Sequence, residues 1–194
     1  MSDRTSVISL DPPIQHDGGA IGELRLREPT GGEMRDAEKE LDGGFTAEAA
    51  SAFEVSLVGA VTGVAAAALD KLPVTIMRQA RTFLTAFDVE SGLGRTDAPS
   101  LDVPLPLPES LTVTGISYSE ISLAEPTVGM RRKAESALRT GATSANARQY
   151  QLILVAQASG IPFAAVEKFP VSALNDAEAF LRGFIEPGRR TGSA

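Results

Sequence analysis

The chain has 194 residues, a formal net charge of −7 at pH 7 and no cysteine. The acidic balance argues against a nucleic-acid-binding protein, since such proteins present basic surfaces, and the lack of cysteine excludes disulfides and thiolate metal sites. The longest apolar stretch, Val55–Leu69, is shorter than the roughly 20 residues that span a bilayer. Its N-terminus also lacks the apolar core of a signal peptide, so we expect a soluble, unexported protein.

The first elements predicted along the chain are two strands. Ser6–Leu10 alternates apolar and polar residues and is predicted to end in a turn at Asp11-Pro12-Pro13. Ile21–Glu28 alternates again, and the turn His16-Asp17-Gly18-Gly19 lies between the two stretches. The pattern predicts a β-hairpin.

Helices are predicted to follow. Thr30 and Glu33 have the spacing of a capping box, which would open a helix that runs to Leu41. Thr46 stands at an N-cap position before a longer stretch with apolar residues at helical spacing, and this helix should end or kink at Gly63. A short helix should then run to Leu72 and stop at the following proline.

The last predicted helix has the clearest amphipathic pattern. Thr75 could cap its start. Its apolar stripe consists of Ile76, Met77, Ala80, Phe83, Leu84 and Phe87. A stripe at this spacing favours packing into the core, and the alternative is a groove for a partner.

The chain repeats itself with an offset of 97 residues. Glu23–Phe87 aligns without a gap on Glu120–Phe184, and more than a third of the aligned positions are identical. The second copy has strands predicted at Leu111–Val113 and Tyr118–Leu123, after an extended, proline-rich stretch over 102–108. Its helix caps would be Thr127, Thr143 and Ser172, with Met130 at the capping-box glutamate, and its apolar stripe would be Ala173, Leu174, Ala177, Phe180, Leu181 and Phe184. We interpret the match as a tandem duplication.

The repeat predicts an α+β protein made of two tandem copies of a small module. Each copy would contain a short antiparallel β element followed by three or four helices. The modules are predicted at residues 1–90 and 103–187, with a linker at 91–102 and a disordered tail at 188–194. Residues 1–97 hold 9 basic and 16 acidic side chains, whereas residues 98–194 hold 9 of each. Either the solvated surfaces drifted apart, or the two copies face different partners.

Candidate chemical groups are few. The only histidine, His16, lies in a turn and corresponds to the apolar Val113, so transition-metal sites and histidine-based nucleophilic sites are not expected. Three acids are shared by both copies: Glu23 with Glu120, Glu28 with Glu125, and Glu38 with Glu135. We interpret them as caps and solvated side chains, with Glu28 at a strand end and Glu38 on an outer helix face. No catalytic, cofactor-binding or metal-binding residue is therefore predicted, and the pattern is typical of a binding module.

The stretch that begins Glu23-Leu24-Arg25-Leu26-Arg27-Glu28-Pro29-Thr30-Gly31-Gly32-Glu33 resembles the opening of the tail assembly chaperones of long-tailed bacteriophages, of the Mu-like prophage type. The motif positions in the first copy are Leu24, Leu26, Arg27, Pro29, Gly32 and Glu33. The second copy keeps Leu123, Pro126 and Gly129, with Ala124 at the arginine and Met130 at the acid. Members of the family usually have one module, so the tandem pair is a departure.

The resemblance implies a non-enzymatic chaperone that binds the tape measure protein and keeps it soluble for assembly of the tail tube. It implies a location in the cytoplasm of the bacterial host, absence from the mature virion, no cofactor, and neither nucleic acid nor membrane as partner. The motif residues would be structural or partner-binding. Contacts with other tail assembly proteins and self-association remain open. The rival interpretations are a minor tail or baseplate component retained in the virion, an enzyme with an unfamiliar site, and an adaptor unconnected with phage.

Overall fold

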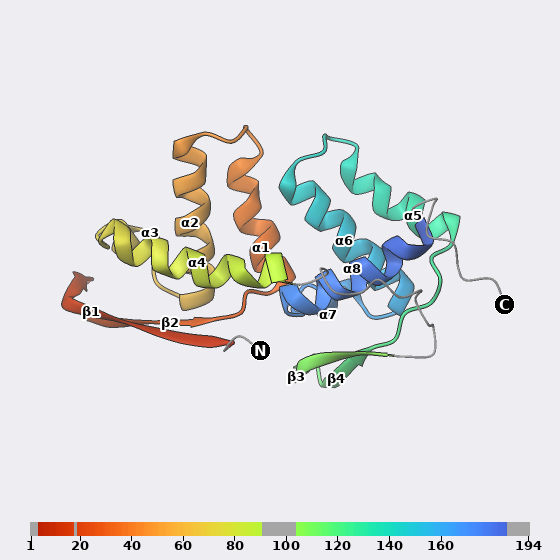
Figure 1. Cartoon of the computed structure of the whole chain (residues 1–194), viewed down its shortest axis with the longest axis horizontal. Helices are drawn as coiled ribbons and strands as arrows, with labels where there is room; N and C mark the ends of the chain where they lie inside the picture. Colours follow the sequence, from red (N-terminus) through yellow and green to blue (C-terminus); the bar gives the residue numbers. More distant parts are fainter. Residues whose placement is uncertain (1–3, 18, 91–103, 186–194) are drawn as a thin grey trace.

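A computed structural model describes residues 4–17, 19–90 and 104–185, and Figure 1 shows that they form two similar modules side by side. In this part of the chain each module has one antiparallel strand pair followed by helices, as the repeat predicts. The predicted linker at 91–102 and the predicted tail at 188–194 lie outside the described residues.

The first module contains two strands, β1 (Thr5–His16) and β2 (Gly19–Arg27), in its described residues. Its helical elements are α1 (Gly31–Glu38), the 3₁₀ turn η1 (Lys39–Leu41), α2 (Ala47–Thr62), α3 (Ala66–Leu69) and α4 (Val74–Glu90).

The second module repeats this order with β3 (Leu105–Val113) and β4 (Ile116–Ile121). Its helical elements are α5 (Val128–Glu135), η2 (Ser136–Leu138), α6 (Ser144–Ser159), α7 (Phe163–Val166) and α8 (Val171–Ile185). Each of its helices begins 97 residues after its counterpart, for example at Val128 against Gly31. The duplicated sequence thus produces a duplicated fold.

The prediction that the first strand ends at Asp11-Pro12-Pro13 is wrong. β1 continues through these residues to His16, with a shift of register against β2 between Ser9 and Ile14. Proline has no N–H for the ladder, so pairing is interrupted there without ending the strand. The predicted hairpin is confirmed, since His16 pairs with Gly19.

The predicted caps are confirmed for the first two long helices of each module. Thr30 and Glu33 form the capping box, and the Thr46 side chain accepts a hydrogen bond from the Ala49 N–H. Gly63 ends α2 in the left-handed conformation, with φ of 73°, as only glycine adopts readily. Thr127, Thr143 and Gly160 occupy the same positions in the second module.

Thr75 and Ser172 do not cap the last helices. α4 begins at Val74 and α8 at Val171, so both hydroxyl residues already lie within the first turn. The preceding prolines, Pro73 and Pro170, suit the entry to a helix because their φ is already helical.

Each module has its own core. Leu84 in α4 and Leu181 in α8 are both fully buried, and each belongs to the core cluster of its module. The apolar stripes of the last helices are therefore core, and the alternative that they form a partner groove is wrong for these leucines. One side chain crosses over: Val171 of the second module is fully buried in the core of the first.

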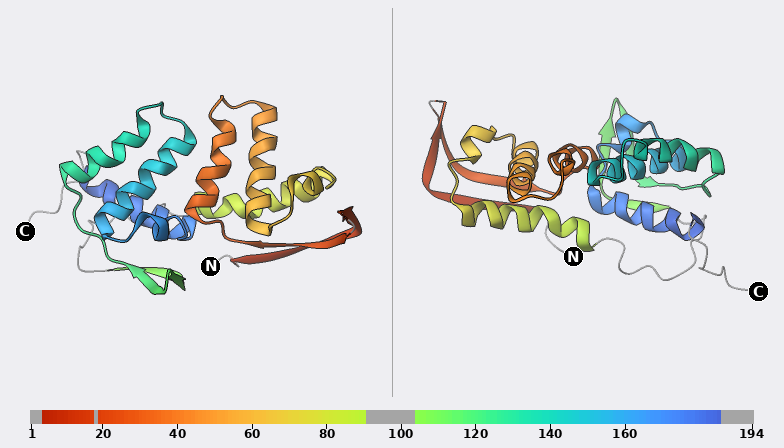
Figure 2. Two further views of the ribbon diagram at one scale, coloured as in Figure 1. Left: turned by 180° about the vertical axis from the view of Figure 1, so that it is seen from behind. Right: turned by 90° about the horizontal axis from the view of Figure 1, so that it is seen from above.

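The two modules have the same orientation along the long axis of the molecule (Figure 1). The view from above in Figure 2 shows α1 of the first module beside the second module. Contacts between the modules run from α1 to α6 and α8, and from α4 to α8. The family-motif segment between β2 and α1 thus lies where the two modules meet.

Candidate functional site

The motif of the first module combines core residues with an exposed ion pair. Leu24 and Leu26 are buried at 0% and 2% exposure in the first core. Arg27 binds the Glu33 carboxylate through two hydrogen bonds of 2.9 and 2.6 Å. Glu33 also accepts the Thr30 N–H at 2.9 Å, so this ion pair fixes the turn that leads into α1.

The backbone of this turn pairs with the second module. The Gly31 N–H donates to the Phe169 carbonyl and the Gly32 N–H to the Glu167 carbonyl, both at 2.9 Å. In return, the Val171 N–H donates to the Pro29 carbonyl at 3.0 Å. A Cβ at Gly31 would lie 2.3 Å from Cδ1 of Leu174 in α8, so only glycine permits this approach.

Glu28, at the end of β2, stabilises the start of a helix in the other module. Its carboxylate accepts the Ser172 N–H at 2.8 Å, which satisfies an N–H in the first turn of α8. Arg4 forms an ion pair with the same carboxylate and donates to the Ser172 hydroxyl at 3.1 Å. Glu28 does lie at the end of a strand, as predicted, but the helix that it contacts, α8, belongs to the second module.

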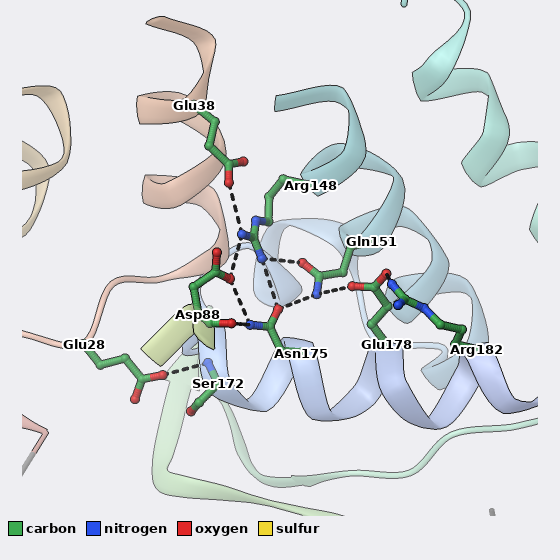
Figure 3. Close-up of polar contacts among 9 residues, drawn as sticks. All are labelled: Glu28, Glu38, Asp88, Arg148, Gln151, Ser172, Asn175, Glu178 and Arg182. Carbon is green, nitrogen blue, oxygen red and sulfur yellow. Dashed lines mark hydrogen bonds and ion pairs between the residues drawn. The ribbon is translucent and has the colours of Figure 1, made fainter. Parts of the chain in front are cut away.

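A buried polar network joins the modules higher up (Figure 3). Arg148 in α6 donates to Glu38 at 3.0 Å, to Asp88 at 2.9 Å and to Gln151 at 2.9 Å. Asn175 of α8 accepts from both Arg148 and Gln151 and donates to Asp88. Glu38 is only 8% exposed, so the prediction that it lies on a solvated outer face is wrong. Sequence reasoning missed this contact because the face of α1 that carries Glu38 is covered by the other module.

The surroundings of Glu38 and Glu33 shift the pKa values of their carboxyl groups. Burial raises the pKa of Glu38, although Arg148 partly opposes the change. Burial also opposes ionisation of Glu33, but the hydrogen bonds from Arg27 and Thr30 outweigh it and hold the pKa of Glu33 below its usual value. Glu38 and Glu33 are therefore shifted in opposite directions, although both lie in α1.

The motif residues of the second module lie in a different environment. Leu123 is buried in its core at 7% exposure, Pro126 is half-buried, and Gly129 is exposed. The capping-box position is filled by Met130, whose sulfur lies 3.5 Å from the Thr127 nitrogen. Of the six motif residues of the first copy, Pro29 and Gly32 form backbone hydrogen bonds with the second module, whereas Leu24 and Leu26 pack in the first core and Arg27 pairs with Glu33.

A groove lies below the contact between modules, beside β3. It has a volume of about 590 Å³ and is lined by the β3 hairpin from Pro108 to Thr114, by Arg4, Thr5, Arg27, Glu28 and Thr30, and by Lys168 and Pro170. β3 pairs only with β4 in the described part of the chain. The groove therefore combines one strand of a two-stranded sheet with three basic side chains from elsewhere in the molecule.

The described residues contain no group of three histidine or acidic side chains placed to bind a metal ion. His16 lies 3.1 Å from the Asp17 carboxylate, in the β1–β2 turn. Among residues 4–17, 19–90 and 104–185, no helix combines the length and apolar character that a membrane span requires.

A comparison with protein families matches both modules to one family, described as phage tail assembly chaperone proteins, E, or 41 or 14. The matches cover residues 7–89 and 104–186. Each match spans one strand pair and the helices that follow it. No curated protein and no solved structure matches the chain significantly.

Proposed function

Because the chain belongs to the phage tail assembly chaperone family, we propose that it binds the tape measure protein and keeps it soluble until the tail tube forms. The observation that carries the proposal is the double family match over 7–89 and 104–186. The proposed role is non-enzymatic, acts in the host cytoplasm and ends before the virion is complete. Contacts with other tail assembly proteins fit the same role.

Because the apolar stripes of the last helices are buried, we propose that the partner binds another surface. Leu84 and Leu181 are fully buried, so they are not available to a partner. The groove beside β3 offers a strand with an edge not paired within the described chain, together with the apolar side chains of Leu111 and Val113. An extended segment can bind such an edge through backbone hydrogen bonds while its side chains enter neighbouring pockets.

The charges around this groove favour a polar segment next to the apolar contacts. Arg4 and Arg27 line it on the side of the module contact but are already paired with Glu28 and Glu33, while Lys168 and Glu109, which also line it, make no ion pair within the described residues. The unequal charge of the two copies is consistent with a partner that meets them with different segments. We also propose that the motif region, Arg27 to Glu33, binds this partner.

Co-expression of the tape measure protein with the full chain tests the proposal. We expect more tape measure protein in the soluble fraction and a complex that survives gel filtration. Thr112→Trp should weaken the complex because it fills the groove from an exposed position on β3. Ser119→Trp is the matched control, since Ser119 is exposed on the same hairpin but does not line the groove.

Two outcomes would contradict the proposal. If the tape measure protein is equally insoluble with and without the chain, and no complex is found, the chaperone role is wrong. If mass spectrometry detects the chain in purified virions at a fixed ratio to the other tail proteins, the alternative of a minor tail or baseplate component takes its place. If the two tryptophan variants weakened the complex equally, the tape measure protein would not bind in the groove.

A further inference from the structure

The groove beside β3 has two walls that belong to different modules. The wall of the first module consists of Arg4, Thr5, Arg27, Glu28 and Thr30. The wall of the second module consists of the β3 hairpin from Pro108 to Thr114, Lys168 and Pro170. Each module is built around its own core, so each wall is held by a separate unit. The distance between the walls therefore depends on the angle at which the two modules meet.

A row of backbone contacts joins the modules directly beside the groove. Residues 29–32 pair with residues 167–171 through three hydrogen bonds of 2.9 to 3.0 Å and through a β-bridge between Thr30 and Pro170. Thr30 and Pro170 also line the groove. Contacts along one row hold two segments together, but they do not by themselves fix the rotation of one module about that row. A second contact, away from the row, is needed to set the angle between the modules.

The second contact is a cluster of side chains that we call the Arg148 network, formed by Glu38, Asp88, Arg148, Gln151 and Asn175. Arg148 donates hydrogen bonds of 2.9 to 3.1 Å to the other four. The network ties α1 and α4 of the first module to α6 and α8 of the second, and Figure 3 shows it above the contact between Glu28 and Ser172. No member of the network lines the groove. It can therefore influence the groove only through the position of the modules.

The fold of a module does not require these residues. With the offset of 97 residues, Arg148 corresponds to Ser51 and Asn175 corresponds to Arg78. Both Ser51 and Arg78 are exposed, and the first module nevertheless has the same order of strands and helices as the second. The role of Arg148 and Asn175 thus belongs to the contact between modules and not to the folding of either module.

The network gives direction to the contact more than it gives stability. Glu38 Oε2 and Arg148 Nε are buried without a hydrogen-bond partner within the described residues. The cost of removing two charges from water offsets much of their attraction, so an apolar pair of similar size would stabilise the contact about as well. An apolar pair lacks the rigid fork of donors that a guanidinium presents to its acceptors. With four acceptors at set positions, Arg148 favours one angle between the modules.

We propose that the Arg148 network positions the two walls of the groove by fixing the angle at which the modules meet. Arg148 is then a positioning residue, which sets the binding surface without touching the partner. The inference rests on the proposed function, since it takes the groove as the binding site of the tape measure protein. Without the network, the backbone row would still join the modules, but they would adopt a range of angles, and only part of that range would fit the partner.

A double substitution, Arg148→Met with Glu38→Leu, separates alignment from stability. Because the chain has no cysteine, spin labels at Ala60→Cys in α2 and Arg132→Cys in α5 can report the angle between modules. Both positions are exposed, and the two helices flank the module contact on opposite sides (Figure 1). By pulsed electron paramagnetic resonance we expect one narrow distance distribution with the network intact. The double variant should give a wider distribution, although its denaturation midpoint stays close to that of the unmodified chain.

Binding of the tape measure protein should change together with the distance distribution. If the fitting angle is populated for about a third to a tenth of the time, the yield of the co-expressed complex should fall roughly 3- to 10-fold in the double variant. A partner that binds only the fitting angle also shifts the modules toward it. The complex that does form should therefore show the narrow distance distribution again. A change in overall stability alone would not produce this recovery.

An ion pair inside the first module provides the matched control. Arg81 in α4 pairs with Glu54 in α2, so Arg81→Met with Glu54→Leu makes the same substitutions away from the module contact. We expect neither the distance distribution nor the yield of complex to change. Asp88→Ala is a milder variant for the case in which the double variant does not fold. It leaves Arg148 paired with Glu38, and the distribution should widen in part.

Three outcomes would overturn the inference. The double variant, or Asp88→Ala in its place, could keep the narrow distribution, so that the network would not set the angle. The distribution could widen while the yield of complex stays the same, so that binding would not depend on the alignment of the walls. The control could lower the yield as much as the double variant does. If the unmodified chain binds no tape measure protein, the proposed function fails, whereas the label distances of the purified chain still decide whether the network fixes the angle.

Discussion

Gly31 and Val128 show how one substitution between copies changes what a surface can do. They occupy the same position at the start of α1 and α5, but Gly31 is buried under the other module and Val128 is 75% exposed. The glycine permits backbone hydrogen bonds to Phe169 that a side chain would block. A Cβ atom added at position 31 would therefore prevent the two modules from approaching this closely.

Gly31→Ala should destabilise the protein by about 1–3 kcal/mol, because the new Cβ would overlap Leu174 and Leu152, both fully buried. Gly129→Ala is the control in the other copy. A Cβ there would meet nothing closer than its own turn's Thr127 at 3.8 Å, and alanine favours the helix, so stability should rise by up to about 1 kcal/mol. Denaturant unfolding measures both values, and equal effects would contradict the close contact.

The opposite pKa shifts of Glu38 and Glu33 predict opposite dependences on pH. Glu38 has a raised pKa in the folded state because of burial, so its contribution to stability is fully present below its unfolded pKa and is lost as pH rises through the folded value. Glu33 has a lowered pKa, so its contribution is present above the unfolded value and is lost as pH falls through the folded one.

Stability measured between about pH 3 and pH 7 should therefore separate two variants. The advantage of the unmodified chain over Glu38→Gln should shrink as pH rises above the ordinary glutamate pKa. Its advantage over Glu33→Gln should shrink as pH falls below that value. If the stability advantage over both variants changed in the same direction with pH, Glu38 would not be buried as described.

At the scale of the elements, the helices depend on partners both near and far in the sequence. α1 and α2 are capped by Thr30 and Thr46, which lie directly before them. α8 instead receives Glu28, a side chain 144 residues away, at its first turn. Local sequence patterns reveal the first kind of cap, and only the packing of two modules creates the second.

Leu84→Ala and Leu181→Ala should each cost about 2–5 kcal/mol of unfolding free energy, as expected when a fully buried leucine is truncated. The two residues occupy matching positions in α4 and α8, so each tests the core of its own module. Thr82→Ala, at an exposed position of α4, should change stability by less than about 0.5 kcal/mol. Effects well below 1 kcal/mol at both leucines would show that these stripes are not core.

At the scale of the whole molecule, the charged network around Arg148 holds two separate cores together. Arg148 and Glu38 have side-chain exposures of only 9% and 11%. Within the described residues, Glu38 Oε2 and Arg148 Nε are buried without a hydrogen-bond partner. A buried pair of this kind contributes less to net stability than to the specific alignment of the modules, because desolvation offsets much of the attraction.

Arg148→Met should therefore destabilise the chain by about 3–5 kcal/mol, since Glu38 would remain buried without its partner. Adding Glu38→Leu should recover most of that loss, because the pair is then replaced by apolar side chains of similar size. Chemical denaturation of the two single variants and the double variant forms the required cycle. If the double variant loses as much unfolding free energy as the two single variants together, Arg148 and Glu38 do not act as a pair.

The amino-acid sequence by itself determined the modules. The 97-residue repeat, the threonine caps, the glycine stops and the apolar stripes predicted two α+β modules with the helices in the observed order, and the motif at Leu24–Glu33 indicated the chaperone family that both copies match. These features are local or periodic, so they can be recognised along the chain without knowing its path in space.

Tertiary structure alone decided how the modules meet. Glu38 was expected on a solvated face, β1 was expected to end at Asp11, and Thr75 and Ser172 were expected to cap helices. The first two expectations failed because a residue distant in the sequence altered the outcome: Arg148 covers Glu38, and β2 resumes pairing at Ile14. The caps failed for a local reason, because α4 and α8 begin one residue earlier than expected, and the first turn of α8 is bound by the distant Glu28. Sequence periodicity records which side of an element is apolar, but it does not record which polar residues of two copies come together, because that depends on packing between segments more than a hundred residues apart.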